Sequence, residues 1–287
     1  MKSVKAEDRV VPIPAKWCGE CKFCISGRPE LCSDRVGIGA GVGGPERCLK
    51  LLKEEGIGGT FAEYLKIPES QVVKVPPEVS LEAATFTEPL ADVIKAQEEV
   101  NARIGDVAVI IGLGPMGLLH IQAMRIHEVS FIVGVDPIRD RREKALRYGC
   151  KVTLDPSVED PVRKIKELTG GTGADIMIVA TGGRAQASCT EQALKMASKG
   201  GRICIFAGTY PPTNISIDPN IIHYNELLLT GSFAYHVSHF LKALELMRQK
   251  KLEVESLRSP VYPIDEIKDA LEAYGTPQAL KVGISVN

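Results

Sequence analysis

A glycine-rich turn between an apolar strand and a helical pattern sets the strongest limit on how this chain can fold. The segment DVAVIIGLGPMGLLHIQAMRI begins with a short apolar run, residues 106–111, and continues into G-x-G-x-x-G, formed by Gly112, Gly114 and Gly117. The next apolar run, SFIVGVD, ends at Asp136, 24 residues after Gly112. A strand, this glycine spacing, a helix and a second strand ending in an acidic residue are typical of a dinucleotide-binding βαβ unit.

Each residue of the turn has an expected role in holding NAD. Gly112 permits the tight turn, Gly114 lets the backbone approach the pyrophosphate, and Gly117 lets the helix pack closely on the strand. The phosphates are expected at the positive N-terminus of the helix, where Pro115 and Met116 lie. A glycine-rich turn that binds no ligand is the alternative interpretation.

Asp136 is expected to accept hydrogen bonds from the hydroxyl groups of the adenosine ribose. Its charge would repel a 2′-phosphate, which favours NAD over NADP. Arg139, Arg141 and Arg142 follow closely and weaken that preference. We include Arg141 among the candidate cofactor-binding residues.

Strand-like and helix-like segments continue to alternate after Asp136. KVTLD, ADIMIVAT, GRICIFAG and ELLLTGSF read as four further strands, and DRREKALRYG, VEDPVRKIKELTG and RAQASCTEQALKMAS read as the helices or helical links between them. Such alternation makes a parallel sheet covered by helices. We therefore predict an α/β fold with a doubly wound Rossmann sheet of six strands in the order 3-2-1-4-5-6. It spans about residues 90–232, with NAD across the switch point at the carboxyl ends of the strands.

Four cysteines form a cluster near the N-terminus, in CGECKFCISGRPELC. Cys18, Cys21 and Cys24 are spaced CxxCxxC and Cys32 follows after seven residues, a spacing that lets one zinc ion gather four thiolates. The glycines and the proline between them favour turns rather than a helix. An iron–sulfur cluster, which also uses CxxCxxC, and disulfides are the alternatives. A closed four-sulfur site has no open position for a substrate, which indicates a structural role.

The segments that flank the predicted sheet have a different pattern. In residues 1–89, short apolar runs end in prolines and glycines, which indicates a β-rich and irregular domain; within it, the Gly-rich stretch 37–59 reads as a surface loop with a short helical middle. VSHFLKALELMRQKKLE (237–253) has a helical apolar pattern. SPVYPIDEIKDALEAYG adds a shorter helix, and ALKVGISVN a last strand.

Composition and charge narrow the classes of partner. The 287 residues carry a formal net charge of −1, which gives no reason to expect nucleic acid or a membrane surface as partner. No apolar run reaches the roughly 18 residues of a membrane span, and the first residues lack the apolar core of a signal peptide, so we expect a cytoplasmic protein. Four further cysteines are expected to be buried free thiols: Cys48, Cys150, Cys189 and Cys204.

The cysteine cluster, the segments GGTFAEYLKIP and FTEPLADVIKA, the turn GLGPMG and Asp136 together resemble the zinc-dependent medium-chain dehydrogenases. These include alcohol, sorbitol-type polyol and threonine dehydrogenases. The resemblance covers essentially the whole chain and implies an NAD-dependent enzyme that acts on a small-molecule alcohol or polyol, as a homodimer or homotetramer. It also implies that residues 1–89 are part of a GroES-like catalytic domain, 90–232 the NAD-binding domain, and 233–287 a return to the catalytic domain.

The resemblance implies further site residues. Glu88 lies where the family places a ligand of the catalytic zinc or a carboxylate beside it, and Lys281 matches a basic residue near the pyrophosphate. Four residues fall on segments that line the coenzyme: Thr181, Phe206, Ser232 and Phe233. Other interpretations stay open, because Glu88 could be a helix-start carboxylate and Lys281 a solvated surface lysine. His120, on the first coenzyme helix, reads as a packing or surface residue.

One part of the family pattern is missing from this sequence. The resemblance places a cysteine and a His–Glu pair before the cysteine cluster as catalytic-zinc ligands, whereas the 17 residues before Cys18 contain neither Cys nor His. We therefore expect the first half of the GroES-like barrel to be absent. Glu88 alone cannot hold a zinc ion that polarises the alcohol oxygen. Three hypotheses follow: a dehydrogenase whose first part lies outside this chain, a non-catalytic NAD- and zinc-binding paralogue or partner subunit, and a metal-free reductase, which the cysteine lobe disfavours.

Overall fold

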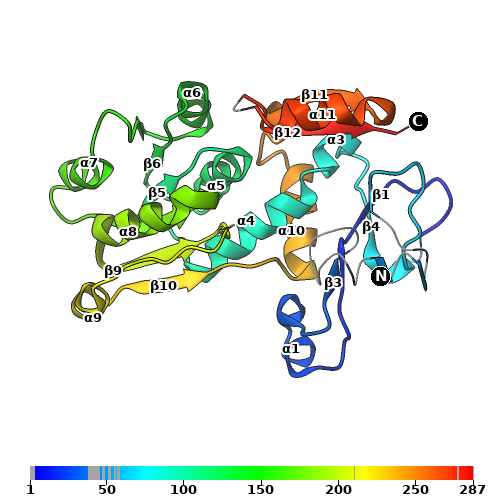
Figure 1. Ribbon diagram of the computed structural model, residues 1–287, viewed down its shortest axis with the longest axis horizontal. Helices are drawn as coiled ribbons and strands as arrows, with labels where there is room; N and C mark the ends of the chain where they lie inside the picture. The colour runs from blue at the N-terminus through cyan, green and yellow to red at the C-terminus, as the bar shows by residue number, and fades with distance from the viewer. Residues whose placement is uncertain are drawn as a thin grey trace. The chain divides into compact units, whose positions relative to one another are not determined.

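A computed structural model describes residues 4–37, 59–209, 211–276 and 278–286, together with six single positions between 46 and 56. The chain divides into two compact units: Met1–Ala91 with Ala234–Asn287 form unit 1, and Asp92–Phe233 form unit 2. The elements of each unit are labelled in Figure 1. Most of the segment 37–59, with its expected loop and helical middle, and Cys48 lie outside the described residues.

Unit 2 is built on one six-stranded parallel sheet (Figure 1). The strands lie in the order β10-β9-β8-β5-β6-β7, which is 3-2-1-4-5-6 when read from β7, so the predicted doubly wound topology is confirmed. The strands are β5 (Val107–Ile111), β6 (Phe131–Val135), β7 (Val152–Leu154), β8 (Ala174–Val179), β9 (Ala197–Ile205) and β10 (Leu228–Gly231).

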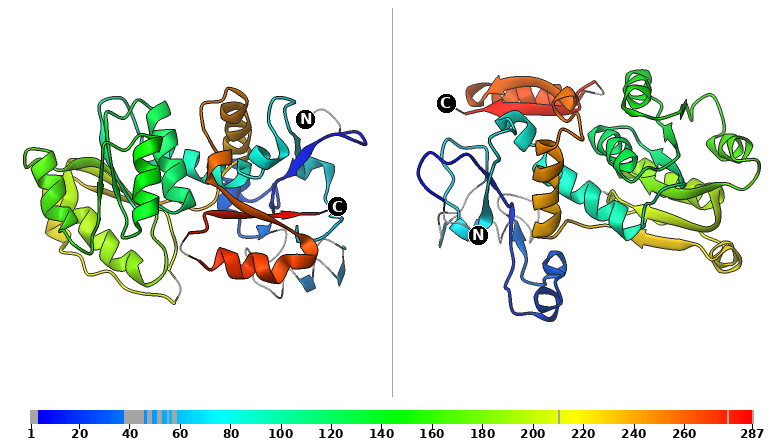
Figure 2. Two further views of the ribbon diagram at one scale, coloured as in Figure 1. Left: turned by 90° about the horizontal axis from the view of Figure 1, so that it is seen from above. Right: turned by 180° about the vertical axis from the view of Figure 1, so that it is seen from behind.

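Helices cover both faces of this sheet (Figure 2). α5 packs with α6, and α7 packs with α8. The helices that belong to unit 2 in whole or part are α4 (Thr87–Glu99), α5 (Pro115–Ile126), α6 (Arg139–Tyr148), α7 (Pro161–Leu168), α8 (Gln186–Met196) and α9 (Pro219–Asn225). The sequence interpretation did not include α9, although Asp218 caps it by accepting the N–H of Asn220 at 2.9 Å and Pro219 is its first residue, two ordinary helix-start signals.

The central strands are buried on both faces, which explains why their sequences are continuous apolar runs. In β5, Ala108, Val109 and Ile110 are fully buried. In β8, Ile176 to Val179 are also fully buried. The two strands pair in parallel, with Val109 beside Met177. This rigid centre supports the loops that leave the carboxyl ends of the strands.

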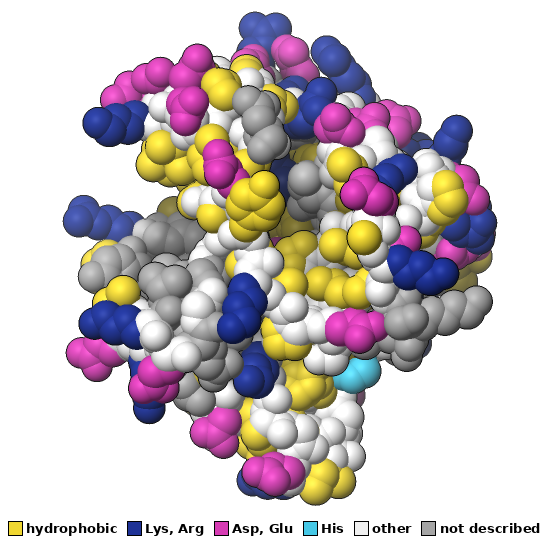
Figure 3. Space-filling model, turned by 90° about the vertical axis from the view of Figure 1, so that its right-hand side faces the viewer, with side chains coloured by type: hydrophobic (Ala, Val, Ile, Leu, Met, Phe, Trp, Pro, Cys, Tyr) yellow, Lys and Arg dark blue, Asp and Glu magenta, His cyan; other side chains and the backbone are white. Residues whose placement is uncertain are grey.

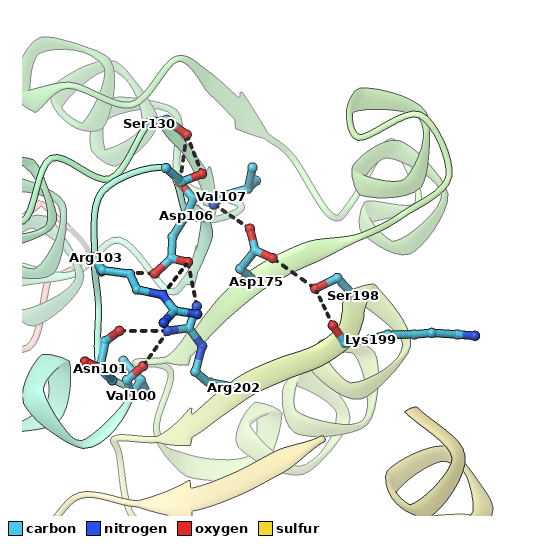
Figure 4. A network of polar contacts seen from close by, with 11 residues as sticks. Val100, Asn101, Arg103, Asp106, Val107, Ser130, Asp175, Ser198, Lys199 and Arg202 are labelled. Atoms are coloured by element: carbon cyan, nitrogen blue, oxygen red, sulfur yellow. Dashed lines mark hydrogen bonds and ion pairs between the residues drawn. The ribbon is translucent and has the colours of Figure 1, made fainter. Parts of the chain in front are cut away.

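A polar network closes the amino edge of the sheet, where the strands begin (Figure 4). Arg202, in β9, donates to the carbonyl oxygens of Val100 and Asn101 at 3.0 and 2.7 Å, just past the end of α4. Its second Nη donates to Asp106 at 2.6 Å, and the exposed fractions of the two side chains are 11% and 7%. Asp175, in β8, links the network to β5 and β9 by accepting a backbone N–H and a serine hydroxyl. The network fastens the beginnings of three strands to one helix end.

Unit 1 consists of short strand pairs and helices. β1 (Val10–Pro12) pairs antiparallel with β4 (Val72–Lys74), and β2 (Ala15–Lys16) with β3 (Val36–Gly37). β11 (Arg258–Pro263) pairs in parallel with β12 (Lys281–Ser285), and α11, which connects them, packs on both. Among the described residues of unit 1, the α-helices besides the first turn of α4 are α1 (Lys22–Ile25), α3 (Leu81–Ala84), α10 (Val237–Arg248) and α11 (Ile267–Tyr274). α10, α11 and β12 lie where the sequence predicts two helices and a last strand.

Basic and acidic side chains are interspersed on the face of the molecule drawn in Figure 3. Among the residues coloured there, neither sign of charge forms a large field of its own, in keeping with the net charge of −1. None of the helices in the described part of the chain combines the length and the apolar character needed to cross a membrane.

Candidate functional site

The glycine-rich turn lies between β5 and α5, at the carboxyl edge of the sheet in unit 2. Gly112 has a φ of +94°, and a Cβ there would overlap the side chain of Thr181. A Cβ on Gly117 would overlap the carbonyl oxygen of Gly112. The position of a Cβ on Gly114 is open by comparison, with the guanidinium of Arg141 3.9 Å away as the nearest group. The turn therefore needs glycine at two positions for its own geometry, and at the third it leaves backbone open to a ligand.

Asp136, directly after β6, is 4% exposed and faces this turn. One carboxylate oxygen accepts the N–H of Leu113 at 2.8 Å, and the other accepts the N–H of Ile138 at 2.8 Å. The guanidinium of Arg141 lies 3.9 Å away. Arg142 instead donates to the backbone oxygen of Asp136 and forms an ion pair with Asp155 at 3.0 Å. Asp136 thus fastens the glycine turn to the second strand, and each of its oxygens keeps a further lone pair for another donor.

The other candidate coenzyme residues of unit 2 follow the neighbouring strands. Thr181 follows β8, Phe206 follows β9, and Ser232 and Phe233 follow β10. The hydroxyl of Thr181 donates to the carbonyl oxygen of Ile111 at 3.2 Å, which ties it to the glycine turn. Phe233 is 58% exposed. Since the strands are parallel, their carboxyl ends bring these residues to the same edge as the turn.

The four clustered cysteines of unit 1 bring their sulfur atoms within 4.8 Å of one another. The sulfur of Cys18 lies 3.5 Å from that of Cys32 and 3.9 Å from that of Cys24, and Cys21 and Cys24 are 3.6 Å apart. Four thiolates about 2.3 Å from one ion would be about 3.8 Å apart. A disulfide needs about 2.05 Å, and the irons of an iron–sulfur cluster would separate the sulfurs further. The spacing therefore fits a single tetrahedral ion.

The cysteine segment contains two short helical turns, α1 and a 3-10 turn at Pro29–Leu31, where the sequence favours turns rather than a helix. Gly19 and Gly27 do form turns, with φ of +84° and +79°. Between them, α1 begins directly after Cys21 and contains Cys24. A four-residue helix is too short to show a periodic pattern, so no sequence signal distinguishes it from a loop.

Two thiols of the cluster have perturbed pKa values. A backbone N–H donated by Cys24 is the main reason that the pKa of Cys21 is lowered to about 7. Loss of hydration raises the pKa of Cys24 to about 12. Metals bind the thiolate form, so the lowered pKa of Cys21 favours its role as a ligand at neutral pH.

Of the other cysteines, Cys150 and Cys204 are buried, as the sequence predicts, and burial raises the pKa of each to about 12. Cys189 is only partly buried, which corrects the expectation for that residue. It lies near the start of α8 at the border of the core.

Glu88, in the first turn of α4, is half-buried beside two basic side chains of unit 1. Burial raises its pKa, while the positive charges of Lys281 and Arg35 act in the opposite direction. The pKa of Lys281 is lowered by burial, against the effect of Glu88, and its ammonium lies 5.3 Å from the centre of the Phe86 ring. Lys281 is therefore not a solvated surface lysine. The sequence interpretation missed Arg35, because no local pattern connects it with Glu88.

The resemblance implies two zinc sites, and the described residues could hold a metal ion at only one of them. The thiol cluster is the one group of three or more His, Cys, Asp or Glu in the described chain that could hold a metal ion. Glu88 has no such companions there, and the two cations near it would repel a divalent ion. The residues thus fit a zinc ion in the thiol cluster and do not fit one at Glu88.

Comparisons with known proteins agree with this geometry. A family model described as zinc-binding dehydrogenase matches residues 115–249, and one described as alcohol dehydrogenase GroES-like domain matches residues 1–77. Sorbitol dehydrogenase from Halalkalibacterium halodurans is 29% identical over 92% of this chain and 72% of its own length. L-threonine 3-dehydrogenase from Bacillus subtilis is 26% identical over 97% and 73%. The structure of an alcohol dehydrogenase from Thermus sp. ATN1 matches with a TM-score of 0.88 at 27% identity, covering 100% of this chain and 80% of that one.

The chain belongs to the zinc-dependent medium-chain dehydrogenases, a family of oxidoreductases. The expected α/β fold with a GroES-like part is confirmed, and so is the family resemblance. The relatives named above include a polyol dehydrogenase and an alcohol dehydrogenase.

Proposed function

We propose that this chain binds NAD at the carboxyl edge of the unit 2 sheet and takes part in hydride transfer between NAD and a secondary alcohol or polyol. The observation that carries the proposal is the glycine turn fastened to Asp136, with Thr181 and Phe206 at the same edge. The backbone N–H groups at the start of α5 would hold the pyrophosphate. When bound, NAD supplies the hydride acceptor.

NAD is preferred over NADP in this proposal because of the charges around Asp136. The carboxylate would bind the ribose hydroxyls and repel a 2′-phosphate. Arg142 is engaged by Asp155 at 3.0 Å, so its charge is already compensated. Arg141 lies close to both Asp136 and Gly114, so in this proposal it would lie between the ribose and the pyrophosphate and bind the phosphates.

We infer that the thiol cluster holds a structural zinc ion. Four sulfur ligands fill a tetrahedral site and leave no position for water or substrate. The cysteines would hold the two short turns around α1 in place, which matters because few residues of that segment are buried. The chemistry of the coenzyme site does not pass through this cluster.

A second candidate function rests on the surroundings of Glu88. Against the effect of burial, the positive charges of Lys281 and Arg35 lower the pKa of Glu88, and they would repel a metal ion. The described residues also offer no further metal ligands beside Glu88, so we derive no catalytic step through a metal ion there. This observation favours a protein that binds NAD and zinc but needs a partner for turnover. Lys281 would then serve to neutralise Glu88 instead of contacting pyrophosphate.

One experiment separates the two candidates. NADH is titrated into the purified chain by fluorescence, and NAD-dependent oxidation of sorbitol, threonine and 2,3-butanediol is followed by NADH absorbance. Binding with turnover supports the dehydrogenase, and binding without turnover supports the partner-dependent protein. Absence of NADH binding contradicts both.

A further inference from the structure

A histidine is buried directly beneath the candidate coenzyme edge. His120, on α5, is 0% exposed. Its ring meets the ring of Phe206 edge to face, with centroids 4.6 Å apart and planes at 89°. Phe206 is itself half-buried, so part of its surface stays accessible to a ligand.

Phe206 lies in the half of the site that a nicotinamide would occupy. Its N–H donates to the carbonyl oxygen of Val179 at 3.1 Å, which fixes its backbone between the ends of β8 and β9. Asp136 follows β6, on the other side of β5 in the sheet order. A dinucleotide lies across the switch point with one mononucleotide on each half. Asp136 therefore marks the adenosine half, and Phe206 the nicotinamide half.

His120 is held from a third element, α4. The side-chain amide of Gln97 donates to the backbone oxygen of His120 at 2.9 Å and lies 3.4 Å from its ring Nδ1. Gln97 is also 0% exposed. Within the described part of the chain, Nε2 of His120 makes no hydrogen bond. Burial lowers the pKa of this imidazole to about 3, so the ring is uncharged at neutral pH.

A purely structural role explains this residue poorly. A buried imidazole nitrogen without a partner destabilises the fold, whereas leucine would fill similar space without that cost. Departures of this kind from good packing chemistry concentrate at functional sites. The edge-to-face contact with Phe206 is what the imidazole provides and an aliphatic side chain does not.

We propose that His120 is a positioning residue, which sets the ring of Phe206 against the nicotinamide half of the coenzyme. The proposal rests on the proposed function, since it requires NAD at this edge. His120 does not touch the coenzyme in this account. It acts through Phe206, and Gln97 fixes the orientation of the His120 ring.

The test compares two ligands that differ in the nicotinamide. NADH fills both halves of the site, whereas ADP-ribose fills only the adenosine half and the adjacent phosphates. Dissociation constants for both are measured on the full chain by calorimetry, for wild type, His120→Leu, His120→Phe and Phe206→Ala. We expect His120→Leu to weaken NADH binding roughly threefold to tenfold, the range of an aromatic pair contact, and to leave ADP-ribose binding unchanged.

Two variants show whether the effect passes through Phe206. His120→Phe retains an aromatic ring and should restore most of the preference for NADH over ADP-ribose. In the Phe206→Ala background, His120→Leu should change neither ligand further.

Other results would overturn the inference. If His120→Leu weakened NADH and ADP-ribose equally, or weakened neither, His120 would not position Phe206. If wild-type protein bound ADP-ribose and NADH with the same affinity, the nicotinamide half would be misplaced. Wild type that bound neither ligand would overturn the proposed function itself, and the inference with it.

Discussion

The two edges of the unit 2 sheet each carry a buried aspartate that accepts a backbone N–H and has a guanidinium 3.9 Å away, but only Asp106 also meets a guanidinium in close contact. Asp106, at the amino edge, is 6% exposed and meets the guanidinium of Arg202 at 2.6 Å. Asp136, at the carboxyl edge, is 4% exposed, and its carboxylate is held by two backbone N–H groups, with the guanidinium of Arg141 3.9 Å from that carboxylate. Burial and residue type are therefore the same, and the partners differ.

The partners of a buried carboxylate indicate whether it stabilises the fold or binds a ligand. A carboxylate in close contact with a buried cation is compensated within the fold, so removal of either partner is costly. A carboxylate held by backbone amides beside an open glycine turn still offers lone pairs to a ligand. The amino edge is thus a structural clamp and the carboxyl edge a candidate binding site.

The largest expected effect is at the amino edge. Arg202→Met removes the close cation from the buried Asp106, whose carboxylate then keeps the more distant guanidinium of Arg103, 3.9 Å away. We expect a loss of about 3–5 kcal/mol in the free energy of unfolding, measured by urea denaturation. The double variant Arg202→Met with Asp106→Leu should recover part of the loss, because the stranded charge is removed. A loss below about 1 kcal/mol for the single variant, the range of a surface ion pair, would show that the clamp is not stabilising.

The next effect is at the carboxyl edge and concerns affinity. Asp136→Ala removes a charged acceptor of the ribose hydroxyls, so we expect NADH binding to weaken about tenfold to a hundredfold, with a smaller loss for NADPH. Fluorescence titration measures both. Asp106→Asn is the matched control, expected to lower stability and leave the NADH dissociation constant unchanged. Equal losses of NADH affinity in the two variants would contradict the assignment of coenzyme binding to the carboxyl edge alone.

A third effect is the response of the carboxyl edge to acid. Burial lowers the pKa of His120 from 6.5 to about 3. Between these two pH values, the imidazole is therefore protonated in the unfolded chain and uncharged in the folded chain. The free energy of unfolding is therefore not reduced by His120 above pH 6.5, and it falls as the pH decreases from 6.5 towards 3. Between pH 8 and pH 5 the loss should be about 2 kcal/mol. Urea unfolding of His120→Leu should lack this component, and parallel pH profiles of variant and wild type would contradict it.

The smallest expected effect on the coenzyme edge comes from the thiol cluster. Cys21→Ser should remove one equivalent of zinc, measured by metal analysis, and destabilise the segment around α1. NADH affinity should stay within about twofold of wild type, because the cluster and the glycine turn lie in different units. Loss of NADH binding together with the metal would show that the two sites are coupled.

The parts of the molecule that depend on residues near each other in the sequence could be predicted. The spacing of Gly112, Gly114 and Gly117 before a helix, and of the cysteines in CxxCxxC, is local chemistry, so the sheet order and the approach of the four sulfurs could be anticipated. The helical turn α1 and the helix α9 were missed, the first because it is too short to show a period and the second because its cap signal was not used.

The doubly wound topology and the chemical nature of the two motifs follow from the sequence alone, because strand periodicity and turn geometry depend on residues a few positions apart. Tertiary packing sets which charged and aromatic groups meet. Asp106 and Arg202 are 96 positions apart. The electrostatic interaction of Glu88 with Lys281 and the ring contact of His120 with Phe206 likewise join distant segments. Such pairings depend on how whole elements pack, and packing places side chains together without leaving a pattern along the chain.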